Sequence, residues 1–91
     1  MSELRETLSE RARAVWDRVV EDRGVPATAT GADGLAAYAT AVARLEDARE
    51  RIDRDGLIVA DAKGQPVPHP ALALERALQA DLQKLRQGLH R

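Results

Sequence analysis

Residues 64–78 read GQPVPHPALALERAL, and this stretch decides how the rest of the chain is interpreted. Pro68 and Pro70 stand on either side of His69, and a proline keeps the residue before it extended. Pro70 also suits the first position of a helix, where its missing N–H costs no hydrogen bond. The stretch therefore predicts a rigid turn into a helix over residues 70–87. Capping or packing is the simplest role for His69, because no partner residue supports a catalytic or metal-binding one.

Leucines recur along this helix at steps of three and four residues. They are Leu74, Leu78, Leu82, Leu85 and Leu89. The spacing indicates one apolar face, similar to the seam of a short coiled coil. This face can close a helical core within the chain or lie between subunits, and both roles can hold at once.

The residues before the turn predict a short β-hairpin over residues 57–67. Leu57 to Val59 favour a strand, Gly64 suits the turn, and the segment up to Val67 can return extended. Gly56 is well placed to end the preceding helix in the left-handed conformation. Because a lone hairpin is unstable in water, it must pack on the helices or pair with a neighbour's strand.

Two further amphipathic helices are predicted before the hairpin. The first covers residues 3–22, with Ser2 as its N-cap and Trp16 on its apolar stripe. A place in the core is the simplest role for this single large aromatic side chain. The second helix is long, residues 31–55, with Thr30 as its N-cap. Its charged half, RLEDARERIDRD, fits either a solvated face or an ionic seam between subunits.

The composition gives the chain a thin core. It has one Trp, one Tyr and no Phe in 91 residues, and its apolar residues are mostly Ala, Leu and Val. Chains of this length bury only about 60–65% of the surface that their unfolded form exposes. Oligomerisation is a common remedy for such a core. The sequence therefore predicts a single domain over residues 1–91 that works as a multimer.

No catalytic motif is present. The chain lacks cysteine, which excludes disulfides and thiolate metal sites, and it lacks a P-loop, a nucleophile elbow and an H-E-x-x-H motif. We expect no enzyme activity, no cofactor and no metal. The alternative is a small helical mutase that clamps a dicarboxylate with arginines, to which LRETLSERARAV and ARLEDARERI bear a loose likeness.

Membrane insertion and export are not expected either. No apolar stretch approaches the roughly 20 residues that span a bilayer. The N-terminal residues are too charged for a signal peptide. An intracellular protein is the resulting expectation.

The charge pattern allows nucleic-acid binding without announcing it. Net charge is −1, and the last sixteen residues carry a mild basic excess. Because an avid binder usually shows a basic patch, binding here would need several copies acting together. The expected DNA contacts are Arg76, Lys84, Arg86 and Arg91. The arginines of the first helix are also eligible, namely Arg5, Arg11, Arg13 and Arg18.

The second half of the chain resembles the phage terminase small-subunit family, in particular its cos-type branch. The resemblance is carried by ERIDRDGLIVADAKGQPVPHPALALERALQADLQKLRQGL. In that family a long helix ends in glycine, a strand pair carries a glycine turn, and asparagine or histidine precedes Pro-Ala-Leu and an amphipathic helix. Ala14 to Trp16, and Leu35 with Tyr38, extend the likeness over nearly the whole chain.

The resemblance implies a mainly α fold: three helices, the central one long, with a short β-hairpin between the second and third. It also implies a ring of about eight to ten copies. Such a protein is a non-catalytic component that recognises viral double-stranded DNA at the packaging site. It delivers this DNA to the large terminase subunit for genome packaging, in the cytoplasm of an infected or lysogenic bacterial host. The source would be a phage, a prophage or a satellite element.

Two sets of residues are expected to build the assembly. The oligomer interface would use Leu35, Tyr38, Val42, Leu45, Leu78, Leu82, Leu85 and Leu89. A structural hinge would use Gly56, Gly64, Pro68, His69 and Pro70. The chain lacks a clear helix-turn-helix reader, and its net charge is near zero. The near-zero net charge favours the alternative function, a protein-only helical adaptor or oligomerisation module without DNA binding.

Overall fold

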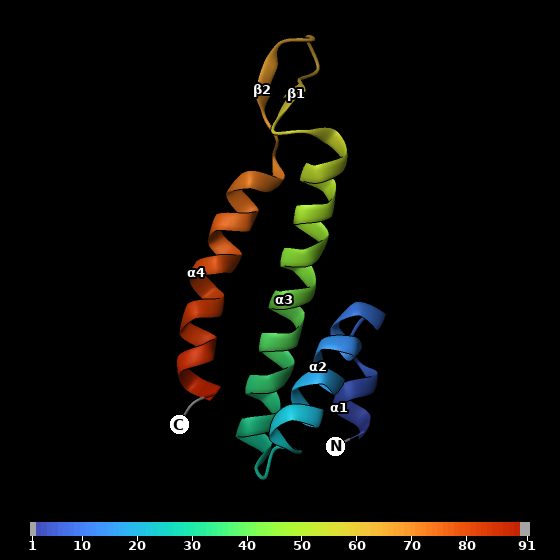
Figure 1. Ribbon diagram of the computed structural model, residues 1–91, viewed down its shortest axis with the longest axis vertical. Coiled ribbons are helices and arrows are strands. Elements are labelled where there is room, and N and C mark those ends of the chain that lie inside the picture. The colour runs from blue at the N-terminus through green and yellow to red at the C-terminus, as the bar shows by residue number, and fades with distance from the viewer. Residues whose placement is uncertain (1, 90–91) are drawn as a thin grey trace.

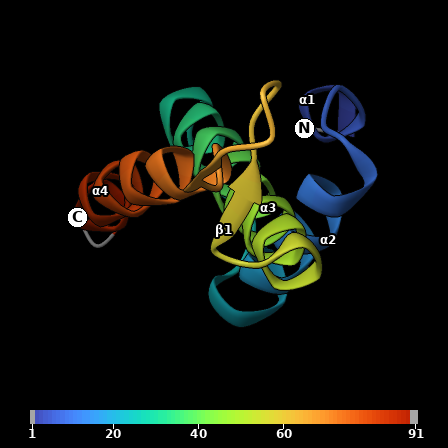
Figure 2. The ribbon, with the colours of Figure 1, turned by 90° about the horizontal axis from the view of Figure 1, so that it is seen from above.

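The longest helix forms the spine of the molecule. The computed structural model describes residues 2–89, and in it α3 (Ala29–Asp55) runs along the centre of the helical part (Figure 1). The helices α1 (Ser2–Glu6) and α2 (Glu10–Arg23) lie on one side of α3, and α4 (Ala71–Leu89) lies on another (Figure 2). A hairpin of β1 (Ile58–Ala60) and β2 (Pro66–Pro68) joins α3 to α4.

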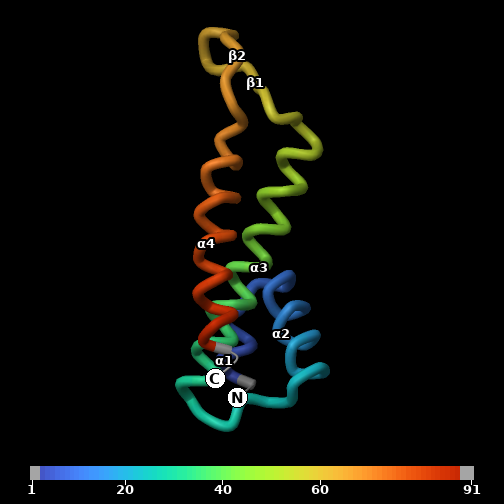
Figure 3. Tube along the Cα trace, turned by 60° about the vertical axis from the view of Figure 1, so that its left-hand side comes forward, coloured from blue at the N-terminus to red at the C-terminus, as the bar shows by residue number. Residues whose placement is uncertain are grey.

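This architecture confirms the predicted fold class of a mainly helical chain with a short antiparallel hairpin before the last helix. The molecule measures 52 × 24 × 19 Å. The hairpin projects beyond the ends of α3 and α4, while α1 and the end of α4 lie at the opposite end (Figure 3). No helix among residues 2–89 is long and apolar enough to cross a membrane.

The prediction of one continuous helix over residues 3–22 was wrong. The chain turns between α1 and α2, where the Ser9 side-chain oxygen accepts a hydrogen bond from the Ala12 N–H at 3.1 Å. Ser9, not Ser2, is therefore the N-cap of the longer helix. The Thr7 hydroxyl donates to the Leu4 carbonyl at 2.6 Å and closes α1. Since α1 still packs against the core, the apolar stripe continues across the break between α1 and α2. The spacing of apolar residues therefore does not reveal this break.

The start of α3 also differs from the expectation. Thr28 rather than Thr30 is its N-cap, and the Thr28 hydroxyl accepts from the Gly31 N–H at 2.9 Å. At the other end Gly56 has φ 85°, and its N–H donates to the Ile52 carbonyl at 2.7 Å. A left-handed φ of this kind is readily adopted only by glycine.

The core is divided into separate clusters along α3. The α2–α3 cluster contains Trp16, which is 5% exposed, with Val15 and Leu35. The α3–α4 cluster contains Leu45, Leu78 and Leu82. A smaller cluster near the hairpin is formed by Ala48, Ile52 and Ala71. The leucine face of α4 thus closes a core within one chain, and α2 and α4 each use a different part of α3.

Candidate functional site

The arginines of α1 and α2 form ion pairs within the chain. The alternative DNA contacts each have a carboxylate close by. The pairs are Arg5–Asp17 at 2.7 Å, Arg11–Glu50 at 2.9 Å, Arg13–Glu6 at 3.3 Å and Arg18–Glu46 at 3.5 Å. The hydrogen bond from Arg5 lowers the pKa of Asp17 below its usual value. These arginines already have negative partners within the chain.

The basic side chains of α4, unlike those of α1 and α2, form no ion pair among residues 2–89. Arg76, Lys84 and Arg86 are exposed, and none has a carboxylate within 4.0 Å among residues 2–89. The neighbouring Glu75 pairs with Arg49 of α3 at 3.1 Å instead. Arg91, the fourth expected DNA contact, lies outside the described residues. Three of the four expected cations are therefore free to meet a phosphate.

These three cations do not share one face of α4. Arg76 and Lys84 lie about 80° apart around the helix, whereas Arg86 lies about 160° from Lys84. Lys84 lines a groove on one flank of α3, and Arg86 lines a groove on the other. A single subunit therefore presents them in different directions.

Arg44 of α3 joins this group, although the sequence reasoning missed it. It is exposed, has no carboxylate within 4.0 Å in the described chain, and lines the same groove as Lys84. The sequence carries no local signal for this, because Asp47 stands three residues after Arg44, a spacing that also suits an ion pair. In the structure Asp47 pairs with Arg51 instead, at 3.0 Å. Arg44 and Lys84 together place two free positive charges on one groove.

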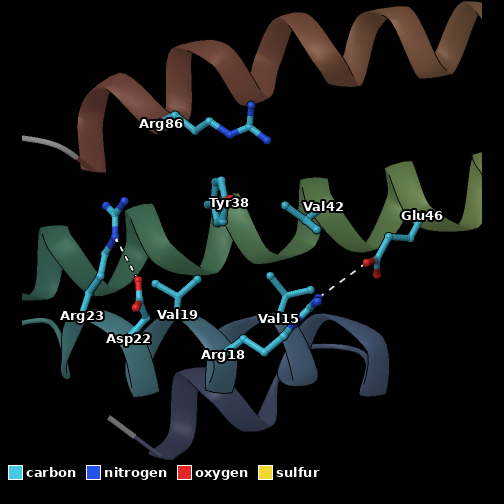
Figure 4. A pocket seen from close by; sticks show the side chains of 9 residues that line it. All are labelled: Val15, Arg18, Val19, Asp22, Arg23, Tyr38, Val42, Glu46 and Arg86. Atoms are coloured by element: carbon cyan, nitrogen blue, oxygen red, sulfur yellow. Dashed lines mark ion pairs between the residues drawn. The ribbon is translucent and has the colours of Figure 1, made fainter.

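Grooves lie along α3 because α2 and α4 do not cover it completely. The first groove, of about 430 Å³, has a floor of Val15, Val19, Tyr38 and Val42 between α2, α3 and α4 (Figure 4). Acidic and basic side chains of α2 and α3 rim it, and Arg86 reaches over it from α4. The rim carries three arginines and two acids, and two of the arginines pair with these acids, Arg18 with Glu46 and Arg23 with Asp22. An apolar floor with a mostly ion-paired rim resembles a protein contact more than a nucleic-acid contact.

The second groove lies between α1 and α4, on the other flank of α3. It has about 620 Å³ and is lined by leucines of α4, of α1 and of the turn after α1, by small residues of α3, and by Arg44, Asp81 and Lys84. Two cations against one acid give this groove a positive excess.

The expected oligomer interface is largely inside the chain. Leu35 and Leu82 are 2% exposed, and Leu45 and Leu78 are 6% exposed, so these four side chains are already covered by their own helices. Tyr38, Val42 and Leu85 are half-buried and line the grooves. Leu89 is the last residue of α4, and its side chain is not part of the described structure.

The expected hinge forms a hydrogen-bonded junction. The Ala71 N–H donates to His69 Nδ1 at 2.9 Å, and His69 Nε2 lies 3.0 Å from Asp55 Oδ2. Because Nδ1 accepts, Nε2 carries the proton and donates to Asp55. The pKa of Asp55 is lowered below its usual value by hydrogen bonds from Arg54 and then from His69. One imidazole thus ties the end of α3 to the start of α4.

Prolines flank this junction, and glycine forms the hairpin turn. Pro68 ends β2, and Pro70 directly precedes α4. Gly64 has φ 80°, and Asp61 Oδ1 accepts hydrogen bonds from the backbone N–H groups of Lys63 and Gln65. Among residues 2–89 no group of three or more histidine or acidic side chains could hold a metal ion.

Comparison with known proteins places the chain in a family. The family model described as phage terminase, small subunit, matches residues 12–90. No curated protein and no solved structure matches the chain.

Proposed function

We propose that this chain, which belongs to the phage terminase small-subunit family, recognises viral double-stranded DNA and delivers it to the large terminase subunit. The family acts in phage DNA packaging. In this proposal the chain is a non-catalytic component, and the large subunit supplies the ATPase and the nuclease. The host would be an infected or lysogenic bacterium.

The separation of paired and free cations supports the DNA-binding part of the proposal. Every basic residue of α1 and α2 has a carboxylate within 4.0 Å, whereas Arg44 and the three basic residues of α4 have none in the described chain. Lysine and arginine bind DNA mainly through phosphates, and each contact releases counterions. A free cation gains this interaction without giving up an internal ion pair. The α3–α4 side is therefore the DNA-facing side in our proposal.

Charge-neutralising variants test this assignment. Arg44→Gln with Lys84→Gln removes two free charges, and Arg11→Gln with Arg18→Gln removes two paired charges as the matched control. We expect fluorescence anisotropy on a duplex to show weaker binding for the first pair only, with a salt slope smaller by about 2 per engaged subunit. Equal weakening by the control pair would remove the assignment to the α3–α4 side.

The Arg76 and Arg86 positions need separate variants because they point in other directions. Arg76→Gln and Arg86→Gln show whether the duplex also touches the outer face of α4 or the first groove. Circular dichroism of every variant establishes that the helices are intact.

The shape of the chain supports assembly into a ring. Its accessible surface is 6459 Å², whereas a monomeric protein of this mass exposes about 5,200 Å². Its radius of gyration is 15.8 Å, against about 12 Å for a compact chain of 91 residues. The excess of about 1,250 Å² approaches the area that two modest subunit contacts would cover. Tyr38, Val42 and Leu85, which line the grooves, are the interface residues that we propose.

Light scattering coupled to size-exclusion chromatography tests the ring. We expect a mass of about eight to ten protomers, consistent with a closed cyclic assembly. A monomer or dimer at high protein concentration contradicts a ring that forms without partners.

The first groove favours a second candidate function, a protein-only adaptor. Its apolar floor and the ion pairs of its rim suit a partner protein, and the chain's net charge is −1. An adaptor predicts no measurable DNA affinity at physiological salt and assembly only with a partner. The same anisotropy titration separates the two functions.

A further inference from the structure

The two edges of the hairpin differ in what they offer to another strand. The pairs Ile58–Pro68, Val59–Val67 and Ala60–Pro66 lie opposite each other. The His69 N–H donates to the Leu57 carbonyl at 2.7 Å, and the Asp61 N–H donates to the Gln65 carbonyl at 2.9 Å. Along an antiparallel ladder, residues whose backbone N–H and C=O groups point to the partner strand alternate with residues whose groups point away from it. The backbone groups of Val59 and Val67 therefore also point to the partner strand within the hairpin. The outward backbone groups therefore belong to Ile58 and Ala60 on β1, and to Pro66 and Pro68 on β2.

Proline blocks one of these edges. Neither outward residue of β2 has an N–H, and the two rings occupy the positions where a neighbouring strand would dock. The outer edge of β1 has a complete set of donors and acceptors, because Ile58 and Ala60 each supply an N–H and a carbonyl. A continuous head-to-tail sheet of hairpins is disfavoured, because half of its hydrogen bonds would be missing at every junction.

The β1 edge is also apolar and open. Ile58 is 59% exposed and Leu57 is 61% exposed. Neither strand contains a charged residue, although proteins commonly protect open edges with lysine or other charges. The hairpin stands clear of the helices (Figure 1), so neither α3 nor α4 covers this edge. A two-stranded sheet of this kind gains stability when further strands are added.

We propose that β1 pairs antiparallel with β1 of a second copy of this chain, around a two-fold axis at Val59. In this register Ile58 lies opposite Ala60 of the other copy, and both pairs exchange two hydrogen bonds, so all four outward N–H groups of the two β1 strands are satisfied. The four strands form one sheet in which the exposed Ile58, Ala60, Pro66 and Pro68 of both copies share a face. A second copy is the favoured occupant because the edge is complementary to itself in donors, acceptors and apolar character.

This contact differs from the contacts that close a ring. Neighbours in a cyclic ring meet through two different surfaces, whereas β1 meets itself. The pairing therefore joins subunits of two rings, or two free subunits. Three-residue strands cover far less than the roughly 800 Å² per partner of a standard interface, so several such contacts would act together in an assembly. The inference depends only on the hairpin and does not require DNA binding.

Cysteine cross-linking tests the register directly, because the chain contains no cysteine of its own. In the proposed pairing, Val59 lies opposite Val59 of the second copy as a non-hydrogen-bonded pair. Its Cα–Cα distance of about 4.5 Å suits a disulfide. Ile58 is a diagonal neighbour of Ile58 in the second copy, and these residues lie about 7–8 Å apart, beyond the reach of a disulfide. We expect Val59→Cys to give a disulfide-linked dimer under mild oxidation, and Ile58→Cys to give little.

Two further variants complete the test. Val59→Cys with Ala60→Pro should lose the linked dimer, because proline removes an outward N–H, whereas Val59→Cys with Ala60→Val should keep it. A mixture of the Val59→Cys and Val67→Cys proteins reports head-to-tail pairing, since these residues would then face each other. Preferential linkage between the two proteins of that mixture overturns the proposal. It is equally overturned if Val59→Cys links no faster than Ile58→Cys, which would leave the β1 edge to a strand of a different protein.

Discussion

Replacement of His69 tests how firmly the start of α4 is held. In His69→Ala the Ala71 N–H loses its acceptor, and loss of an N-cap typically costs about 1 kcal/mol. The lost hydrogen bond to Asp55 adds to this destabilisation. A 91-residue domain has a total stability of about 5–14 kcal/mol. A loss of about 1.5 kcal/mol is therefore a substantial part of it, and corresponds to a fall in Tm of about 6–12 °C.

His69→Asn separates the cap from the contact with Asp55. Asparagine is among the best N-cap residues, so its side chain can accept from the Ala71 N–H. It is too short to take over the full contact with Asp55. We expect His69→Asn to recover most of the stability that His69→Ala loses.

Urea unfolding followed by circular dichroism measures both His69 variants. Trp16 fluorescence reports the α2–α3 cluster independently, so coincident transitions establish two-state unfolding. If His69→Asn is no more stable than His69→Ala, the cap does not explain the role of His69. If His69→Ala unfolds at the same urea concentration as the wild-type chain, neither hydrogen bond stabilises the fold.

Three other perturbations have defined outcomes. Leu82→Ala should lower the free energy of unfolding in urea by about 3 kcal/mol, because the Leu82 side chain is 2% exposed. Leu74→Ala should cost under about 1 kcal/mol, because Leu74 is 48% exposed. Equal losses for the two variants would contradict the packing of α4. Ser9→Ala should cost about 1 kcal/mol and Ser9→Asn much less, and no difference between them would exclude the Ser9 cap. The folded-state pKa of Asp55 is lowered, so its stabilisation is present above about pH 3.8 and lost as pH falls further. Asp55→Asn should therefore flatten the acid limb of a stability–pH curve, and an unchanged limb would refute this.

The sequence predicted the second half of the chain better than the first for a physical reason. Pro68, Pro70 and Gly56 act locally, because each restricts or permits a backbone conformation wherever it stands. The hairpin and the start of α4 followed from these residues. The break before α2 depends on Ser9 capping a helix while Leu8 still reaches the core, and an apolar stripe cannot distinguish this from a continuous helix.

The free cations could be identified only in part. Arg11 pairs with Glu50, which lies 39 residues away in the chain, and Arg49 pairs with Glu75 across α3 and α4. Pairs of this kind depend on how the helices pack, so no local spacing reveals them. The sequence therefore left the arginines of the first helix eligible as DNA contacts beside the expected basic residues of α4. It also gave no reason to single out Arg44, whose distinguishing feature is a groove shared with Lys84.

The spread of charge around α4 makes the number of copies decisive for DNA binding. If a duplex meets Arg44 and Lys84 of one subunit, the expected salt slope is about −1.8, and binding falls only about 12-fold between 50 and 200 mM salt. Four subunits that engage the same duplex in this way make about eight phosphate contacts, with a slope near −7 and a fall of about 10⁴-fold. The measured slope thus counts the subunits that touch DNA, independently of the mass of the assembly. A ring with a slope near −2 would mean that assembly and DNA binding use the chain for different purposes, because multiplied contacts are what a ring contributes to a weakly basic surface.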